Sequence, residues 1–465
     1  MTPLAFKQLQ ELFKSSLMIS MLWFGLGAPS AIANPPHQSA PHQSPTLSAL
    51  LLNPQRLQQA LDQQNIVGAI RQVELGWKTQ YEEYYQGKLT SQLVEVADMA
   101  RALERLHRIT GQKTALVYAI PTPKALELVV VFPGTRPIHK RVTAANREAL
   151  GQLARSFRLG IIDPNSPSQA YLKPGQQLYS WIMTPIESEL QAQGIDTLIF
   201  CLGTRLRSLP LAALHDGKQF LVEKYNLAII PAFNLLDSSP SQLQNAQVLA
   251  MGASEFRNLP PLPAVPIELA TITEQLWQGK ALLNQDFTPQ RLKAERNAQP
   301  FSIVHLATHA EFSPGSIHDS YIQFWNSRVS PDQFRDLELR VPAVQLLVLS
   351  ACRTALDPQA ELGFAGSAVM SGSKATLASL WAVSDAGTLV LMTEFYRQLR
   401  SAPIKAAALR QAQLTMLHQQ VRLATNPAIQ TQRTAELPPP LASQRHAVLS
   451  HPYYWAGFTL VGNPW

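Results

Sequence analysis

A chain of 465 residues is long enough for two or three domains with a large apolar core. Apolar residues make up 46% of it and charged residues only 15%, which excludes a largely disordered protein. The formal net charge of +7 is a modest excess, and no dense run of lysine and arginine occurs, so the composition gives no support for nucleic-acid binding.

The first 33 residues have the pattern of a signal peptide. Lys7 and Lys14 precede a short apolar stretch, Leu17–Ala28, and Ala31-Ile32-Ala33 fits a cleavage site of small residues. The apolar stretch is too short for a comfortable transmembrane helix. We therefore expect export to the periplasm or the extracellular space, with no membrane span after the signal is removed. An uncleaved N-terminal membrane anchor is the alternative.

A linker and a helical segment are expected next. Residues 34–52 are rich in Pro, Gln and Ser and contain the sequence PHQS twice, which predicts a disordered linker. Residues 53–112 show helical periodicity in Arg56–Arg71 and Leu93–Ile109. Four aromatic residues are expected to pack between these helices: Trp77, Tyr81, Tyr84 and Tyr85. The alternative is that this segment provides a surface for a regulatory protein.

Strands and helices alternate from residue 113 to the end, which predicts an α/β fold with a mostly parallel sheet flanked by helices. A hairpin is expected from Ala115–Ile120 and Leu126–Phe132, which Pro121 and Pro123 separate. The other expected strands are Thr197–Leu202, Val248–Gly252, Ala281–Leu283, Ser302–Ala310, Leu346–Ala355, Thr376–Val383 and Phe458–Val461. The expected helices are Val142–Leu159, Tyr171–Gln193, Pro266–Leu276, one carrying Leu389–Leu399, and Ile404–His418, with a loop at 422–447.

Two of the expected strands carry a chemically capable side chain near their carboxyl ends, His309 in one and Cys352 in the other. Ligands of open α/β sheets gather just beyond those ends. A thiol and an imidazole that meet there form a nucleophile–base dyad. The backbone N–H groups of Ala310 and Cys352 would then face the developing oxyanion, and Arg353 adds positive charge that favours the thiolate.

Plainer interpretations of the same residues remain open. A cysteine that ends an apolar strand is commonly a core residue, and His305 is expected to be a buried, hydrogen-bonded core histidine. Cys201 is the other cysteine, and a disulfide with Cys352 is open in an exported protein. The sequence has no HExxH, paired CxxC or GxSxG motif, and Gly372–Thr376 lacks the order of a phosphate loop. We therefore expect no metal and no cofactor.

Several ordered segments resemble one known family. They are LRSLPLAALHDGKQFLVEKY at 206–225, VHLATHAEF at 304–312, LLVLSACRTA at 346–355, ATLASLWAVSD at 375–385, EFYRQL at 394–399, ALRQAQ at 408–413 and HPYYWAGFTLVG at 451–462. Together they resemble the CHAT domain, which belongs to the caspase-like cysteine peptidases related to separase. The likeness assigns residues 113–465 to a CHAT domain, with an N-terminal part at 113–245 and a caspase-like core at 246–465.

The resemblance implies a His309–Cys352 dyad that cleaves a peptide bond through an acyl-enzyme. Caspases carry the histidine about 50 residues before the cysteine, and here the separation is 352 − 309 = 43. In separase-like relatives an acidic residue after a Leu-Trp-x-Val strand lies near the pocket for the residue before the cut. That likeness places Asp385 and Trp381 in the substrate pocket, where Asp385 would select Arg or Lys. Capping of the next helix by Ser384 or Asp385, and a core position for Trp381, are the alternatives.

The sequence thus predicts a cysteine endopeptidase that acts on a protein or peptide substrate without a cofactor. One alternative is a non-catalytic interaction module that presents the same fold as a peptide-binding cleft. The other is a transferase that uses the same thiol.

Overall fold

The computed structural model describes residues 53–86, 88–89, 94–163, 169–241, 243–314, 317–354, 358–430 and 437–465. The expected signal peptide and linker lie outside these described residues. None of the helices in the described residues has the length and apolar character needed to cross a bilayer.

Three helices precede the sheet: α2 (Pro54–Asp62), α3 (Ile66–Tyr84) and α4 (Val96–Thr110). The prediction of a single helix over Arg56–Arg71 is wrong, because the helix is interrupted between α2 and α3. Gln64 takes a left-handed conformation with φ of 55°, and the Asn65 side chain accepts from Gly68 N–H at 2.9 Å. This Asn cap starts the new helix at a different angle.

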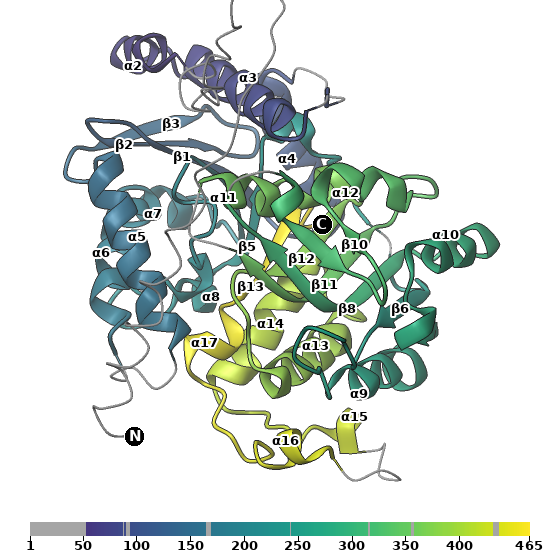
Figure 1. The fold of residues 1–465 in the computed structure, drawn as a ribbon. Helices are drawn as coiled ribbons and strands as arrows, with labels where there is room; N and C mark the ends of the chain where they lie inside the picture. The colour runs from purple at the N-terminus through teal and green to yellow at the C-terminus, as the bar shows by residue number, and fades with distance from the viewer. Residues whose placement is uncertain are drawn as a thin grey trace, which may run out of the picture. The chain divides into compact units, whose positions relative to one another are not determined.

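The described strands form one sheet of thirteen. They are β1 (Thr114–Pro121), β2 (Leu126–Val131), β3 (Ile138–Val142), β4 (Thr197–Leu202), β5 (Asn226–Ile230), β6 (Val248–Gly252), β7 (Gly279–Leu283), β8 (Ile303–Phe312), β9 (Tyr321–Gln323), β10 (Arg328–Val329), β11 (Leu346–Thr354), β12 (Ala375–Ser379) and β13 (Phe458–Gly462). Their order is β10-β9-β8-β11-β12-β13-β5-β4-β1-β2-β3, with β6 beside β8 and β7 beside β6. The mostly parallel α/β sheet expected from the sequence is confirmed (Figure 1).

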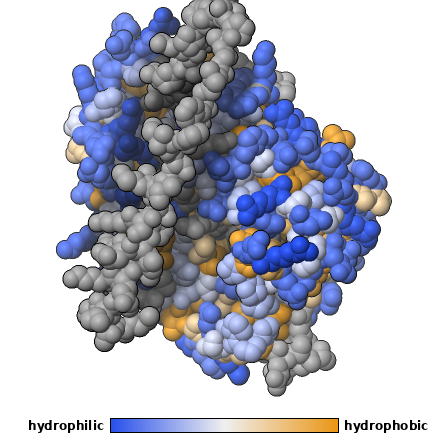
Figure 2. Space-filling view, in the orientation of Figure 1, coloured by the Kyte–Doolittle hydropathy of each residue, from blue (hydrophilic) through white to orange (hydrophobic). Residues whose placement is uncertain are grey.

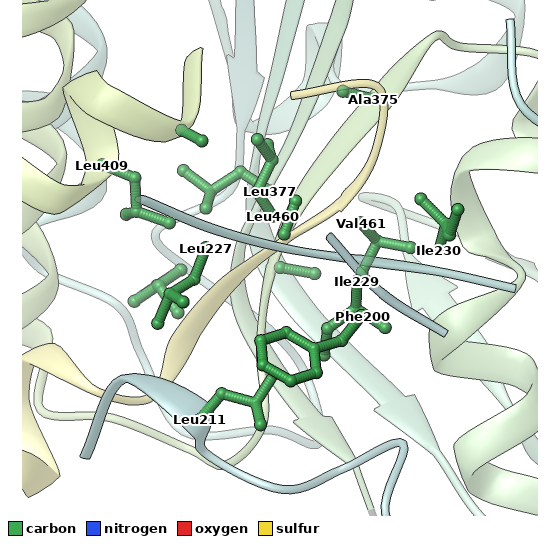
Figure 3. Packing of buried hydrophobic residues seen from close by; sticks show 14 of the residues in the cluster. Phe200, Leu211, Leu227, Ile229, Ile230, Ala375, Leu377, Leu409, Leu460 and Val461 are labelled. Atoms are coloured by element: carbon green, nitrogen blue, oxygen red, sulfur yellow. The ribbon is translucent and has the colours of Figure 1, made fainter. Parts of the chain in front are cut away.

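The sheet has two halves of opposite direction that meet at β13. Strands β6, β7, β8, β11 and β12 are mutually parallel, and so are β1, β4, β5 and β13. At the junction β13 pairs antiparallel with β12, with Leu460 opposite Leu377, and parallel with β5, with Val461 opposite Ile229. Figure 3 shows these apolar side chains packed together. The two halves therefore share one continuous core.

Helices flank the sheet on both sides. They are α5 (Arg147–Ile162), α6 (Leu172–Ile182), α7 (Thr184–Ala192), α8 (Leu221–Lys224), α9 (Val265–Ala270), α10 (Pro289–Ala298), α11 (Pro358–Ala365), α12 (Ser367–Ser371), α13 (Asp385–Leu399), α14 (Lys405–Leu417), α15 (Pro427–Gln430), α16 (Pro439–Ala442) and α17 (Pro452–Trp455). Helix α4 packs on β1 and β2, α11 on β8 and β11, and α14 on β5 and β13. Hydrophilic residues cover most of the outer face seen in Figure 2, as a buried apolar core requires.

Some elements differ from the expected ones for local reasons. Strand β3 has the polar sequence IHKRV and lies at an edge of the sheet, so it lacks the apolar signal of a buried strand. The helix expected over Tyr171–Gln193 is two helices that meet near Met183, before Pro185. The helix expected over Pro266–Leu276 is α9 followed by a π-helical turn, η3 (Thr271–Leu276).

The N-terminal helices are joined to the sheet by buried polar contacts. The Glu74 carboxylate accepts from the Tyr118 hydroxyl at 2.7 Å, from Phe233 N–H at 2.9 Å and from Asn234 N–H at 2.8 Å. The Tyr85 hydroxyl donates to the carbonyl of Gly363 in α11 at 3.0 Å. Of the four aromatic residues expected to pack between the N-terminal helices, Trp77 lies 6.2 Å from the Tyr118 ring of β1 and Tyr85 binds α11, so the expectation is wrong for these two.

Candidate active site

The histidine and cysteine strands are direct neighbours in the sheet. Strands β8 and β11 run parallel, and Cys352 is in register with Ala310, the residue after His309. A bulge interrupts the register between Ser350 and Cys352. The prediction that these two strands lie side by side is confirmed, and both continue two or three residues past His309 and Cys352. The Cys352 side chain lies outside the described part of the structure, so the dyad contact itself stays a prediction.

Two residues of the loop at 253–264 hold the imidazole of His309. Its Nε2 lies 2.9 Å from the backbone carbonyl oxygen of Pro260. A carbonyl only accepts, so Nε2 carries the proton and Nδ1 keeps the lone pair of the neutral ring. The Phe256 ring packs edge-on against the imidazole, with 4.7 Å between centroids and an interplanar angle of 62°. Ring orientation and tautomer are therefore both set.

The loop that carries Pro260 is fixed at both ends. At its start, Ala253 N–H donates to the carbonyl of Ala307 in β8 at 3.1 Å. At its end, Ala264 N–H donates to the Asp385 carboxylate at 2.9 Å. A methyl group on Gly252, just before the loop, would lie 2.5 Å from the Ala307 carbonyl oxygen, so this close approach needs glycine. The support of His309 is preorganised.

Asp385 is the first residue of α13, and Ser384 provides the cap of that helix by accepting from Gly387 N–H at 3.3 Å. The carboxylate of Asp385 instead binds the start of α9. The pKa of Asp385 is raised to about 6, mainly by burial and to a smaller extent by the nearby Glu268, while the bond from Ala264 N–H opposes both. Of the two alternatives for capping, Ser384 is therefore the residue that caps, and a substrate contact of Asp385 stays a prediction.

Trp381 lies in the core, with 4% of its surface exposed. Its indole N–H donates to the carbonyl of Tyr453 at 3.1 Å, and the Arg158 guanidinium lies 5.9 Å from the centre of its ring. These contacts agree with the core position, which was one of the two roles expected for Trp381. A role of Trp381 as a pocket wall stays a prediction.

His305 is the buried core histidine that the sequence predicts. It is fully buried, with Nε2 2.9 Å from a Glu268 carboxylate oxygen and Nδ1 3.2 Å from the Tyr396 hydroxyl. Both ring nitrogens thus face polar groups inside the core.

The backbone of Ala310 lies inside the sheet. It is in register with Cys352 of β11 on one side and with Ile322 of β9 on the other. Strands therefore flank Ala310 on both sides. The expected oxyanion site would need an N–H group that faces the substrate. The oxyanion role of Ala310 and Cys352 stays a prediction.

The remaining candidates for nucleophile or metal site are weak. Cys201 is fully buried in β4, and burial raises the pKa of its thiol well above the ordinary value, with Glu74 adding to the effect. Its thiol is therefore a poor nucleophile. The part of the chain that the structure describes contains no group of three or more His, Cys, Asp and Glu side chains arranged to hold a metal ion.

Sequence reasoning missed Pro260 and Phe256. They act on His309 from a segment 49 or more residues earlier, through a backbone carbonyl and a ring. The proline-rich run LPPLPAVP at 259–266 is the visible signal, and it indicates a loop without indicating what the loop contacts.

A mostly parallel sheet flanked by helices, with a histidine strand beside a cysteine strand, is the arrangement of the caspase-like class. The family model of the CHAT domain matches residues 172–463, which is well over half of the chain. The chain belongs to the CHAT domain family.

Two solved structures are similar at low sequence identity, and both are complexes of Saccharomyces cerevisiae separase with securin. The one at 2.6 Å is 8% identical with a TM-score of 0.47. The one at 3.0 Å is 9% identical with a TM-score of 0.45. Each match covers 86% of this chain and 34% of the separase chain, so this chain spans about a third of that protein. No curated protein sequence matches this chain.

Proposed function

We propose that this protein is a cysteine endopeptidase in which Cys352 is the nucleophile and His309 the proton carrier. The proposal is carried by the position of His309, which lies on β8, the strand next to the one that carries Cys352. The Nε2–H of its imidazole donates to the Pro260 carbonyl at 2.9 Å. With Nε2 protonated, the free lone pair on Nδ1 is the atom that can accept the thiol proton.

The reaction proceeds in two steps. Nδ1 of His309 takes the thiol proton, the sulfur of Cys352 forms a bond to the scissile carbonyl carbon, and the carbonyl electron pair moves to oxygen. The tetrahedral intermediate collapses, the C–N bond breaks, and the leaving amine takes the proton from the imidazolium. Water then attacks the thioester carbon as its proton passes to His309, the C–S bond breaks to release the carboxylic acid product, and the imidazolium returns the proton to the sulfur to restore the thiol. The Pro260 carbonyl stabilises the imidazolium that forms in each step.

The finer part of the proposal is a preference for Arg or Lys before the cleaved bond. Asp385 is partly buried near Ala264, in the loop that supports His309, and one of its oxygens accepts from the Ala264 N–H. A carboxylate at low solvent exposure favours a guanidinium or ammonium partner. The ionised carboxylate of Asp385 is the group that would select an Arg or Lys side chain.

Cleavage of a random peptide library tests the proposal. Wild type should cut, Cys352→Ala and His309→Ala should lose cleavage, and Cys201→Ala should keep it if it folds, since Cys201 is buried in β4. Iodoacetamide should label Cys352 much faster than Cys201. The protein would be an interaction module instead of an enzyme if it binds peptides without cleaving them and both thiols are labelled equally slowly. The protein would be a transferase if the acyl group is transferred to added amines faster than it is hydrolysed.

We also propose that the protein acts after export, as residues 1–33 indicate. N-terminal sequencing of the mature protein should then begin at Asn34. A membrane-bound form that keeps Met1 would support the uncleaved anchor instead.

A further inference from the structure

A groove lies at the edge of the sheet opposite to His309 and Cys352. Strands β5 and β13 run opposite to β11 and β12, so the carboxyl ends of the first pair and the amino ends of the second meet at this edge. From Leu346 to Cys352 the strand advances six residue steps, which span about 20 Å. The groove is therefore separated from the cysteine by most of the height of the sheet.

Two adjoining cavities form the groove, with volumes of about 800 Å³ and about 480 Å³. Arg340, Val369 and Gly372 line both, so the two cavities adjoin each other. We call them together the basic groove. A volume of this size suits a ligand larger than a single ion.

Cations line both walls of the basic groove. Arg101 and Arg105 lie one turn apart on α4, so they project from the same side of that helix. Arg340 and Lys374 come from the opposite wall, just before β11 and β12. The second cavity adds Lys88 and Arg335.

The acidic residues of the basic groove are already engaged. Asp98 forms an ion pair with Arg101, and Asp237 lies 3.4 Å from Lys374. Glu338 pairs with Lys293, outside the groove, at 3.2 Å. These carboxylates therefore leave other cations of the two walls unmatched.

Four cations of the groove have no carboxylate within 4 Å anywhere in the described ranges: Lys88, Arg105, Arg335 and Arg340. They come from segments far apart in sequence, which the fold brings to one hollow. Such a set of unmatched positive charges complements a ligand that carries several negative charges.

Part of the lining between the charged walls, which we call the floor, is apolar. It is formed by Phe233, Leu235 and Leu236, from the loop after β5, and by Val369. Val341 adds an aliphatic side chain that is 80% exposed beside the second cavity. A ligand that alternates acidic and apolar groups matches both the walls and the floor, whereas an inorganic anion leaves the apolar floor uncovered.

We propose that the basic groove is a docking site for an extended, acidic segment of a protein partner. In an extended segment the side chains alternate sides, so carboxylates reach the arginines while apolar residues cover the floor. The inference does not depend on the dyad, because the groove and the cysteine lie at opposite edges of the sheet.

Fluorescence anisotropy with a labelled ten-residue peptide of alternating Glu and Leu tests the proposal. The measurement uses full-length Cys352→Ala, so a peptide that is never cleaved still reports on docking. We expect binding that weakens with salt, and at least tenfold weaker binding of the Gln–Leu analogue. The double variant R105E/R340E should bind the acidic peptide at least tenfold more weakly. Its thermal unfolding is compared with that of Cys352→Ala to show that it is folded.

The matched control is R155E/K173E, which makes the same change in charge at two exposed cations outside the groove. It should bind within about twofold of the parent, because a remote pair of charges is screened at physiological salt. An equal loss in both double variants, or no loss in R105E/R340E, would overturn the docking site. Tighter binding of a twelve-residue thymidine oligonucleotide that displaces the acidic peptide would assign the groove to nucleic acid and overturn it as well.

Discussion

The carboxylate of Asp385 accepts the backbone N–H of Ala264 at 2.9 Å, and this bond ties the start of α13 to the end of the loop that supports His309. The same loop contributes the Pro260 carbonyl that receives Nε2–H of His309. One carboxylate thus contacts the loop that positions the proposed base, and it lies where a basic substrate side chain is proposed to bind. Its ionisation should affect these two functions differently.

The preference for arginine before the cut should grow as pH rises through about 6. Burial and Glu268 raise the pKa of Asp385 to about 6, so its charge appears over that range. Two peptides that differ only in Arg or citrulline are compared by the ratio of their kcat/KM values, in which ionisation of the dyad cancels. The ratio should increase by up to about tenfold from pH 5 to pH 7, because the ionised fraction of a group with this pKa rises about tenfold over that range and only the ionised form offers a charge-assisted hydrogen bond.

Two substitutions separate the functions of Asp385. Asp385→Asn keeps an oxygen for Ala264 N–H and removes the charge, so it should flatten the ratio and leave citrulline cleavage near wild type. Asp385→Ala also releases the loop and should lower kcat for citrulline. A ratio that stays constant with pH in wild type would show that Asp385 has no contact with the substrate.

Phe256→Ala should lower kcat without a comparable loss of substrate binding. The ring packs on the imidazole of His309 with 4.7 Å between centroids, and its removal lets the imidazole rotate away from the Pro260 carbonyl. We expect roughly a tenfold loss of kcat, in line with a small misplacement of a catalytic group. Phe256→Leu keeps an apolar contact and is the matched control. Equal kcat in wild type and both variants would show that Pro260 alone positions the ring.

Tyr85→Phe should destabilise the protein by about 1 kcal/mol, since its buried hydroxyl donates to carbonyls of α11 at 3.0 Å and 3.3 Å. Gly366→Ala should cost more, because a methyl group there would lie 2.5 Å from the Tyr85 hydroxyl oxygen. Urea unfolding measures both. Tyr321→Phe, at a partly exposed tyrosine, is the control and should have an effect near zero. Full stability of Tyr85→Phe would mean that water replaces the hydroxyl contact.

Lys405→Met should change how stability depends on pH. The pKa of Lys405 is lowered from 10.5 to about 7, mainly by burial and to a smaller extent by the charge of Lys374. Between these values the unfolded chain binds more protons than the folded one, so the contribution of Lys405 to stability rises with pH. The unfolding free energy of wild type minus that of the variant should rise by roughly 4 kcal/mol from pH 7 to pH 10. Exposed Lys173→Met should show no such slope, and a flat difference for Lys405→Met would contradict its buried neutral state.

The sequence predicted the centre of the fold better than its margins. Strands β8 and β11 begin with the largely apolar stretches IVHLA and LLVL because both faces of the sheet are covered, and such stretches are typical of buried parallel strands. By contrast, β3 is polar at an edge and β5 is a five-residue strand, so neither carries a distinct signal. Direction in the sheet was also hidden, because apolar content does not distinguish parallel from antiparallel neighbours at β12 and β13.

The candidate site divides in the same way. His309 and Cys352 could be found because each is a reactive side chain in an apolar strand with a family motif around it. Pro260 could not, because it acts through a backbone carbonyl that every residue has. The binding of Ala264 by Asp385 depends on a contact across 121 residues of sequence, which no local pattern reports.

The position of β13 also sets the order in which the molecule can be completed. Residues 458–462 lie between β12 and β5, so before they are synthesised each of those strands has an open edge. During synthesis on the ribosome, helices can pack on the part of the sheet that contains β8 and β11. Helices can also pack on the part that contains β1, β4 and β5, but the two parts cannot yet be joined through the sheet. Until then both are exposed to pairing with other chains. The sheet of such a protein therefore stays in two parts until β13 pairs with both strands.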